Sequence, residues 1–290
     1  MKKRGIDVSH HNGWVDWQRA ARDGVEFAIL KIGNGSRKNT PSVDTRFEEN
    51  ARGALEAGIP IGGYVASYAM EPAHAAGEAA FFGQLLKAYK EKFSFPIFYD
   101  MEGEGKGGFY DQWPLGREMV SDICETFCAA MTQAGWLCGI YVNENWRKNR
   151  IREDLQRRYP LWLAHYGVSK PTYTGPIHLW QQSSAGRVDG ILGKVDVNYV
   201  MSEQPVAGIV ATEQAKPRIL RQGVAGADVL ELAKDLEAVG HLGTLGFDAN
   251  LKAQVMAYQA ARGLRADGEV GPLTRAALEA DRVREQRIGA

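Results

Sequence analysis

The sequence predicts an α/β fold, an irregular TIM-like (β/α) barrel followed by a small domain of three helices. Three observations predict it. Short apolar runs of strand length recur up to about residue 200, helical stretches separate the earlier runs, and the composition changes near residue 203. At about 100–200 residues per domain, a chain of 290 residues has room for one large domain and one small one.

Eight apolar runs are predicted as strands, and several are apolar almost throughout. Phe27–Leu30 and Pro96–Tyr99 are examples, and such runs are typical of a parallel sheet that is covered on both faces. Eight strands also close a TIM-like barrel. In chain order the runs are Gly5–Ser9, Phe27–Gly33, Pro60–Tyr68, Pro96–Glu102, Cys138–Asn143, Leu161–Tyr166, His178–Ser183 and Val195–Val200.

Helices are predicted between the earlier strands. Val43–Ala57 repeats apolar side chains at helical spacing, and Pro72–Lys90 and Leu115–Gln133 are also helix-like. Gly58 and Gly135 stand where a helix C-cap glycine is expected. After residue 143 the helices shorten and loops join the last strands. The sequence therefore predicts an outer ring of about five helices that does not surround the barrel completely.

The C-terminal part is predicted as a separate helical domain. Residues 203–217 contain two prolines among small or polar residues and are interpreted as a linker. Beyond them, helices are predicted at Ala227–Val239, at Ala249–Arg262 and from Pro272, where proline fits the first helical position. The predicted organisation is a barrel at 1–202, a linker at 203–217 and a three-helix domain at 218–281.

Composition and charge exclude several classes of protein. Lys and Arg number 35 and Asp and Glu 35, and a net charge of zero argues against a general nucleic-acid binder. No apolar run reaches the ~18 residues that a membrane span needs. The basic start Met1–Arg4 lacks a following apolar segment, so we expect no signal peptide and synthesis in the cytoplasm.

Cysteine usage points the same way. Three cysteines make no disulfide framework, and Cys124 and Cys128 are interpreted as small buried hydrophobes of a helix. The sequence indicates no cofactor and leaves the oligomeric state open.

Four acidic residues at the predicted strand ends carry the candidate chemistry. Asp100 and Glu102 share one side of a strand, roughly 6–7 Å apart at Cβ. Asp7 ends the first strand and Asp196 lies in the last, and closure of a barrel brings these two strands together. Like charges raise one another's pKa, so one carboxyl stays protonated beside an ionised one, as cleavage of a glycosidic bond requires. Metal binding is the alternative, weakened because no His-x-x-x-His ligand pattern is present, and we predict no metal.

Aromatic residues gather on the same strands. Flat aromatic rings suit sugar rings, whose C–H groups stack on them, although core packing is the commoner role of any single aromatic residue. His10 and His11, directly after the first strand, are interpreted as loop or rim residues. The candidate substrate-binding residues are Tyr64, Tyr141, Tyr166 and Trp180.

Residues 4–201 resemble the family 25 glycoside hydrolases, the muramidases common in bacteria and phage endolysins. The motifs occur in order: Gly5–Gly13 with Val15–Trp17, Phe27–Gly35, Phe95–Glu102, Ala134–Trp136 with Gly139–Tyr141, Leu161–Ala164, Leu179–Gln182 and Val195–Asn198. The resemblance implies that Glu102 is the general acid and that Asp100 stabilises the transition state or orients the substrate's N-acetyl group. It also implies that Asp7 and Asp196 complete the site. Two departures are Asn34, where an aromatic residue is frequent, and the glycine-rich stretch Gly103–Gly108.

Residues 218–280 resemble the three-helix peptidoglycan-binding module of cell-wall hydrolases. The most specific stretch is Asp267–Thr274, in which glycines make tight turns before a helix starts at Pro272. Gly223–Leu232, Val255–Gln259 and Gly263–Leu264 also match. The resemblance implies a wall-binding domain that does not cut.

Together these features predict an endolysin-type lysozyme, an N-acetylmuramidase that hydrolyses the β-1,4 bond between N-acetylmuramic acid and N-acetylglucosamine of peptidoglycan. Whether the substrate's acetamido group, an Asp or water attacks stays open. The alternatives are a non-catalytic wall-binding protein and a chitinase-like glycosidase. We expect a phage or prophage enzyme that acts on the wall after release from the cytoplasm.

Overall fold

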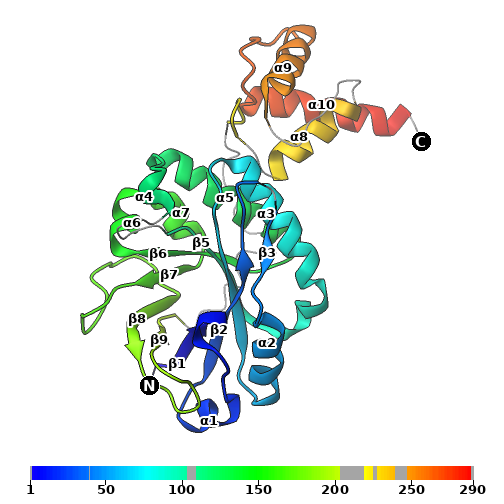
Figure 1. Cartoon of the computed structure of the whole chain (residues 1–290). Coiled ribbons are helices and arrows are strands. Elements are labelled where there is room, and N and C mark those ends of the chain that lie inside the picture. The colour runs from blue at the N-terminus through cyan, green and yellow to red at the C-terminus, as the bar shows by residue number, and fades with distance from the viewer. Residues whose placement is uncertain are drawn as a thin grey trace.

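The computed structural model shows a closed barrel of eight strands, drawn from blue to yellow-green in Figure 1. The structure describes residues 2–38, 40–102, 109–202, 219–224, 227–238 and 247–288. Around the barrel the strands follow the order β1, β9, β8, β7, β6, β5, β4 and β2, and β1 pairs with β2 to close it. Their bounds are β1 (Arg4–Val8), β2 (Phe27–Asn34), β4 (Ile61–Ala66), β5 (Phe93–Asp100), β6 (Cys138–Asn143), β7 (Leu161–Ala164), β8 (Leu179–Gly186) and β9 (Val195–Val200).

Strand β9 is the one barrel strand that runs against its neighbours. It is antiparallel to both β1 and β8, whereas every other neighbouring pair in the barrel is parallel. Residues 187–194 join β8 to β9, too few for the crossover of a dozen or more residues that a parallel pair needs. Asp196 therefore reaches the same end of the barrel as Asp7 from the beginning of its strand, not from the end.

Glycines make room for large side chains inside the barrel. A Cβ on Gly5 would lie 2.5 Å from the ring of Phe27, and one on Gly139 would lie 2.8 Å from the ring of Phe98. Both rings belong to an interior core that also holds Trp162. The interior is thus filled by side chains, as in other small barrels.

Helices cover the outside of the barrel unevenly, as the sequence predicts. The longest, α3 (Pro72–Leu85) and α5 (Arg117–Gln133), pack side by side, and α5 lies against β5 and β6. No helix lies between β7 and β8, whose connecting residues are all described. The other elements of this part are η1 (His10–Asn12), α1 (Trp17–Arg22), α2 (Phe47–Glu56), η2 (Leu86–Lys92), α4 (Phe109–Gln112), α6 (Glu144–Asn149) and α7 (Glu153–Arg158).

The sequence prediction was wrong about where the helix α2 begins. It starts at Phe47, because Ser42 and Val43 form the short strand β3 (Ser42–Val43), which pairs with the end of β2. The predicted glycine caps are correct, since Gly58 and Gly135 have φ angles of 74° and 81°. These left-handed conformations suit glycine after a helix.

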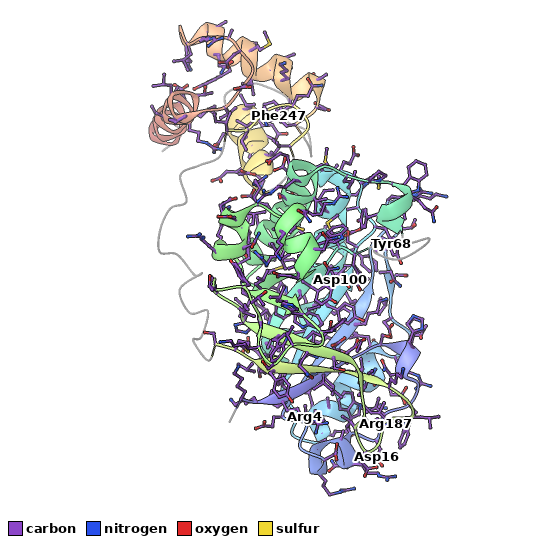
Figure 2. The ribbon with its side chains drawn as sticks, turned by 90° about the vertical axis from the view of Figure 1, so that its left-hand side faces the viewer. Arg4, Asp16, Tyr68, Asp100, Arg187 and Phe247 are labelled. Carbon is purple, nitrogen blue, oxygen red and sulfur yellow. The ribbon has the colours of Figure 1, made fainter. Side chains whose placement is uncertain are left out.

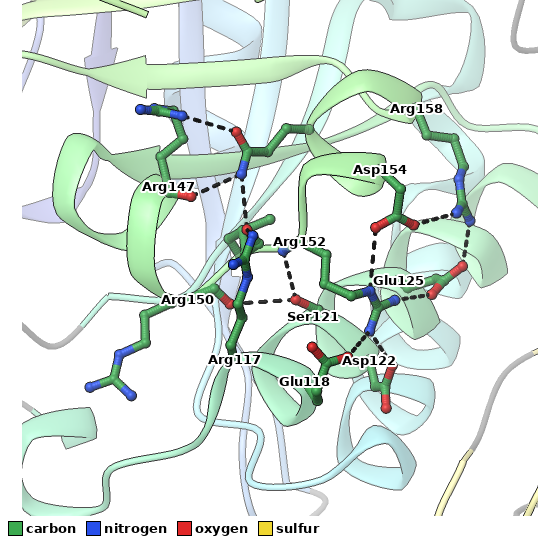
Figure 3. A network of polar contacts seen from close by, with 12 residues as sticks. Arg117, Glu118, Ser121, Asp122, Glu125, Arg147, Arg150, Arg152, Asp154 and Arg158 are labelled. Atoms are coloured by element: carbon green, nitrogen blue, oxygen red, sulfur yellow. Dashed lines mark hydrogen bonds and ion pairs between the residues drawn. The ribbon is translucent and has the colours of Figure 1, made fainter.

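An ionic network fastens α7 to α5 on the outer face of the barrel (Figure 3). Arg152 donates to Asp122 at 2.7 Å and to Glu125 at 2.8 Å. Arg158 donates to Glu125 and to Asp154. Since Glu125 is buried, pairing with two guanidinium groups offsets the cost of removing its charge from water.

The cysteines are buried free thiols, as predicted. Cys124 and Cys128 lie on α5 and Cys138 on β6, and the Sγ atoms of Cys128 and Cys138 are 3.3 Å apart. None of the described helices is long and apolar enough to cross a membrane.

The described residues of the C-terminal part form three helices with a core of their own. They are α8 (Ala227–Ala238), α9 (Ala249–Ala261) and α10 (Pro272–Ile288), close to the predicted bounds. Side chains from all three helices, among them Leu232, Val255 and Leu278, bury one another in this core. The predicted linker at 203–217 lies outside the described residues, so the domain boundaries stay predictions.

Candidate active site

Asp7 lies inside the barrel and pairs across strands with Asp196. Gln181 Nε2 and Asn198 Nδ2 donate hydrogen bonds to Asp7 Oδ1, at 2.9 and 2.8 Å. Burial raises the pKa of Asp7 well above its ordinary value, and the charge of Asp196 raises it further. Burial also raises the pKa of Asp196, which lies opposite Asp7 on the neighbouring strand.

Asp100 is the last residue of β5 and is buried within the barrel domain (Figure 2). Burial raises its pKa well above the ordinary value, and the charges of Glu102 and Asp7 add to the rise. The ammonium group of Lys31 on β2 opposes it. No group among the described residues hydrogen-bonds to Asp100 Oδ1, although this atom is buried. A buried acceptor without a partner, in a group of raised pKa, is typical of a site that receives a ligand.

Glu102 lies two residues beyond the end of β5 and is exposed. The predicted strand extended to Glu102, but pairing stops at Asp100, where the neighbouring strand β4 also ends. Met101, between the two acids, is buried in the core outside the barrel. The charge of Glu102 nevertheless raises the pKa of Asp100 and of Tyr141, so these groups face one space.

Three of the predicted aromatic residues lie with the acids. The hydroxyls of Tyr141 and Tyr166 donate to Gln181 Oε1, at 2.9 and 2.5 Å. Tyr64 lies edge-on to Trp162. Burial is the largest cause of the raised pKa of Tyr64, followed by the charges of Asp7 and Asp100. Tyr166 is 47% exposed, so part of its ring is open to a ligand.

Trp180 is not brought to the acids. Strand residues alternate between the two faces, and Leu179 and Gln181 face the interior of the barrel while Trp180 faces out. Its indole N–H donates to the backbone oxygen of His165, and its ring packs near Tyr199. Only 5% of Trp180 is exposed, which leaves no face for a sugar.

Sequence reasoning missed three polar residues of the mouth: Gln181, Asn198 and Lys31. The two amides orient Asp7, and the Lys31 ammonium lies 6.0 Å from the centre of the Tyr64 ring. The alternation of strand residues was the available signal. It puts Asn198 on the same face as Asp196, and it puts Gln181 on the face opposite Trp180.

His10 lies at the rim, in the short helix η1 after β1. Its Nδ1 is 2.6 Å from Oδ2 of the buried Asp44, and its ring lies 3.9 Å from that of His11. Within the described ranges, no group of three or more His, Cys, Asp or Glu residues is arranged to hold a metal ion.

The mouth therefore combines carboxyl groups in different environments. Asp7 and Asp100 are buried with raised pKa values, while Glu102 is exposed at the rim. Such a difference lets one carboxyl stay protonated while another ionises, as cleavage of a glycosidic bond requires. Tyrosine rings around the acids form a wall suited to a sugar.

Comparisons with known proteins agree with this geometry. The profile described as Glycosyl hydrolases family 25 matches residues 6–191, and that of a putative peptidoglycan binding domain matches residues 225–278. Lysozyme M1 of Streptomyces globisporus is 28% identical over 205 residues, which span 67% of this chain and 66% of that protein. The autolytic lysozyme of Clostridium acetobutylicum is 26% identical over 280 residues, 95% of this chain and 71% of the relative.

A solved structure resembles the barrel. The modular autolysin LytC from Streptococcus pneumoniae, in complex with a synthetic peptidoglycan ligand, has a TM-score of 0.57 and 26% identity. The match covers 68% of this chain but only 46% of LytC, and the chain spans just under two thirds of Lysozyme M1. The chain belongs to the glycosyl hydrolases of family 25 and carries a C-terminal peptidoglycan-binding domain.

Proposed function

We propose that the protein is a lysozyme of the endolysin type, which hydrolyses the β-1,4 bond between N-acetylmuramic acid and N-acetylglucosamine in peptidoglycan. The observation that carries the proposal is the buried, unpartnered Oδ1 of Asp100 between the charges of Glu102 and Asp7, in a mouth walled by tyrosines. Membership of a glycosidase family and a wall-binding domain on the same chain support this substrate.

Glu102 is proposed as the general acid because it is the exposed carboxyl beside the buried acids. Its proton passes to the glycosidic oxygen as the bond to the sugar's anomeric carbon breaks, and the leaving sugar keeps that proton. Water then adds to the anomeric carbon, and its other proton returns to Glu102.

The remaining acids act on the positive charge that develops on the sugar ring. Asp196, which lies opposite Asp7 and is less buried, is proposed to supply negative charge next to the mouth. The free Oδ1 of Asp100 is an acceptor for the N–H of the substrate's N-acetyl group, which would turn the acetamido oxygen toward the anomeric carbon. Tyr64 and Tyr166 are proposed to contact the sugar rings. Tyr141 is only 6% exposed, so its proposed part is to hold Gln181 through its hydroxyl.

Glu102→Gln tests the acid assignment. The variant should release reducing ends from purified peptidoglycan about 10²–10⁴ times more slowly than the wild type, because an amide has no proton to give. Glu118→Gln, an exposed glutamate on α5, is the matched control and should keep the wild-type rate. Release of reducing ends by Glu102→Gln at the control's rate would overturn the assignment.

The C-terminal domain is proposed to hold the enzyme on the wall. A chain truncated near residue 205 should still cut small soluble fragments but should pellet less with intact sacculi. If the truncated chain pellets as well as the full chain, the domain has no role in attachment. Phage encoding and release from the cytoplasm stay predictions from the sequence.

A further inference from the structure

Helix α3 carries a buried glutamate that the proposed reaction does not use. Glu78 is 1% exposed. It lies behind the barrel wall, on the side away from the acids of the mouth, against the outward-facing Tyr99 of β5. Burying a carboxylate is costly unless donors surround it.

Three donors surround the Glu78 carboxyl, and they come from three segments. The amide of Ser36, after β2, donates to Oε1 at 2.9 Å. The hydroxyl of Ser67, after β4, and that of Tyr99 donate to Oε2 at 3.0 and 2.6 Å. Glu78 therefore joins the ends of β2 and β4 to β5.

The backbone leaves space for this contact. Gly35 lies against the carboxyl, and a Cβ at this position would be 2.0 Å from Glu78 Oε1. Its amide donates to Ala66 O at 2.7 Å, so the segment after β2 is also held against the end of β4. Glycine at residue 35 is thus required for the carboxyl to reach the strand ends.

Two of the residues that donate to Glu78 are also linked to Asp100. The backbone N–H of Ser67 donates to Asp100 O at 2.7 Å, and Tyr99 is the residue directly before Asp100. The Tyr110 hydroxyl donates to Ala69 O at 2.9 Å and so holds the segment after Ser67. Two routes, one through a backbone hydrogen bond and one along β5, connect Glu78 to Asp100.

We infer that Glu78 is a positioning residue, which holds the end of β5 through Ser67 and Tyr99 and thereby fixes the carboxyl of Asp100 at the mouth. The inference rests on the proposed function. Glu78 touches no sugar from behind the barrel wall, so its effect falls on the chemical step and not on substrate binding.

Glu78→Gln is the first variant. Its amide NH₂ group must face either the Ser36 N–H, which then loses its acceptor, or the two hydroxyls, which must then turn round to accept, so the hydrogen bonds change while the size of the side chain is kept. Because a small misplacement of a reacting group is costly, kcat on soluble muropeptide oligomers should fall about 10–100-fold, with KM within about twofold of the wild type. Tyr99→Phe removes one donor and keeps the ring stacked on Phe127, and its kcat should fall less.

Glu125→Gln is the matched control. Glu125 is also a buried glutamate on a helix outside the barrel, but its partners are Arg152 and Arg158 of the network in Figure 3. This variant should lower the melting temperature and leave kcat unchanged. Equal loss of kcat in Glu78→Gln and Glu125→Gln, at equal melting temperatures, would show general destabilisation and overturn the inference.

Amide hydrogen exchange gives a readout that does not depend on activity. Exchange of the Ser67 N–H, which donates to Asp100 O, should become at least about tenfold faster in Glu78→Gln and stay unchanged in Glu125→Gln. If the wild type releases no reducing ends, the proposed function fails, while exchange still decides the positioning role. Unchanged exchange in Glu78→Gln, with wild-type kcat, would refute it.

Discussion

Gln181 joins Asp7 to two tyrosines at the mouth of the barrel, and the substitution Gln181→Glu tests how these hydrogen bonds are arranged. Its Nε2 donates to Asp7 Oδ1 at 2.9 Å, while its Oε1 accepts from Tyr141 and Tyr166. A carboxyl of the same shape keeps the acceptor for both tyrosines but has no N–H for Asp7. The substitution therefore places a third acid against the pair of Asp7 and Asp196.

The distance between residue 181 and Asp7 sets the size of the loss of stability. Two unit charges 2.9 Å apart repel by about 6 kcal/mol at an effective dielectric constant of about 20. The new carboxyl avoids this repulsion by taking up a proton, which limits the cost. Keeping a carboxyl with an ordinary pKa of about 4.3 protonated near pH 7 costs about 4 kcal/mol. The free energy of unfolding should therefore fall by up to about 4 kcal/mol near neutral pH.

The loss of stability in Gln181→Glu should depend on pH. A carboxyl whose pKa is raised by folding stabilises the protein fully below its unfolded pKa, and that stability is lost as the pH rises through the raised value. When protonated, the new carboxyl donates to Asp7 Oδ1 as the amide does. The difference in melting temperature from the wild type should thus be roughly 8–16 °C near pH 7 and only a few degrees near pH 4.5.

Thermal unfolding followed by circular dichroism over this pH range is the assay. Gln182→Glu is the control, because it makes the same charge change at the next residue of β8, which is partly exposed. An equal loss of melting temperature at both ends of the pH range would refute the arrangement of hydrogen bonds. A loss in Gln181→Glu no larger than in Gln182→Glu would refute it as well.

Three further substitutions give distinct results. Asp100→Asn should raise the free energy of unfolding near pH 7 by about 1–2 kcal/mol, because the raised pKa of Asp100 makes its charge costly above its unfolded pKa. The same variant should release no reducing ends. A lower melting temperature than the wild type near pH 7 would contradict the predicted sign. Gly35→Ala should lower the melting temperature and kcat together, since the added methyl group displaces Glu78. Wild-type values for both would contradict the close contact between Gly35 and the Glu78 carboxyl. Gln259→Leu should reduce pelleting with sacculi but not hydrolysis of soluble fragments, because buried groups of the C-terminal domain such as the Gly268 N–H lose their hydrogen-bond partner. Unchanged pelleting would show that the domain tolerates this loss.

Local patterns in the sequence predict most of the barrel, and what they miss depends on distant pairing. Apolar runs give Cys138–Asn143 and Val195–Val200 their observed bounds, because burial on both faces leaves a signal in each strand by itself. The reversed direction of β9 follows from the short connection after β8, which matters only once the barrel closes. Strand β3 has two residues and exists only by pairing with β2, so no run of its own predicts it.

The site divides in the same way. Asp7 and Asp100 are predicted because strand ends meet at one mouth, and their side chains do face one space. Gln181 is one of several polar residues of β8, and its role depends on Asp7, far from it in the sequence. Trp180 was chosen by residue type, whereas the alternation of strand residues decides which neighbour faces the interior.

Mass spectrometry of digested peptidoglycan tests the proposed reaction most directly, since it identifies the bond cut and the new reducing sugar together. Wild-type protein should produce muropeptides that end in reducing N-acetylmuramic acid, and Glu102→Gln should produce almost none. Reducing N-acetylglucosamine would show that the other glycosidic bond is cut. Cleavage of chitin oligomers with no muropeptides would indicate a chitinase-like enzyme, and pelleting with walls without any glycan product would indicate a non-catalytic binding protein.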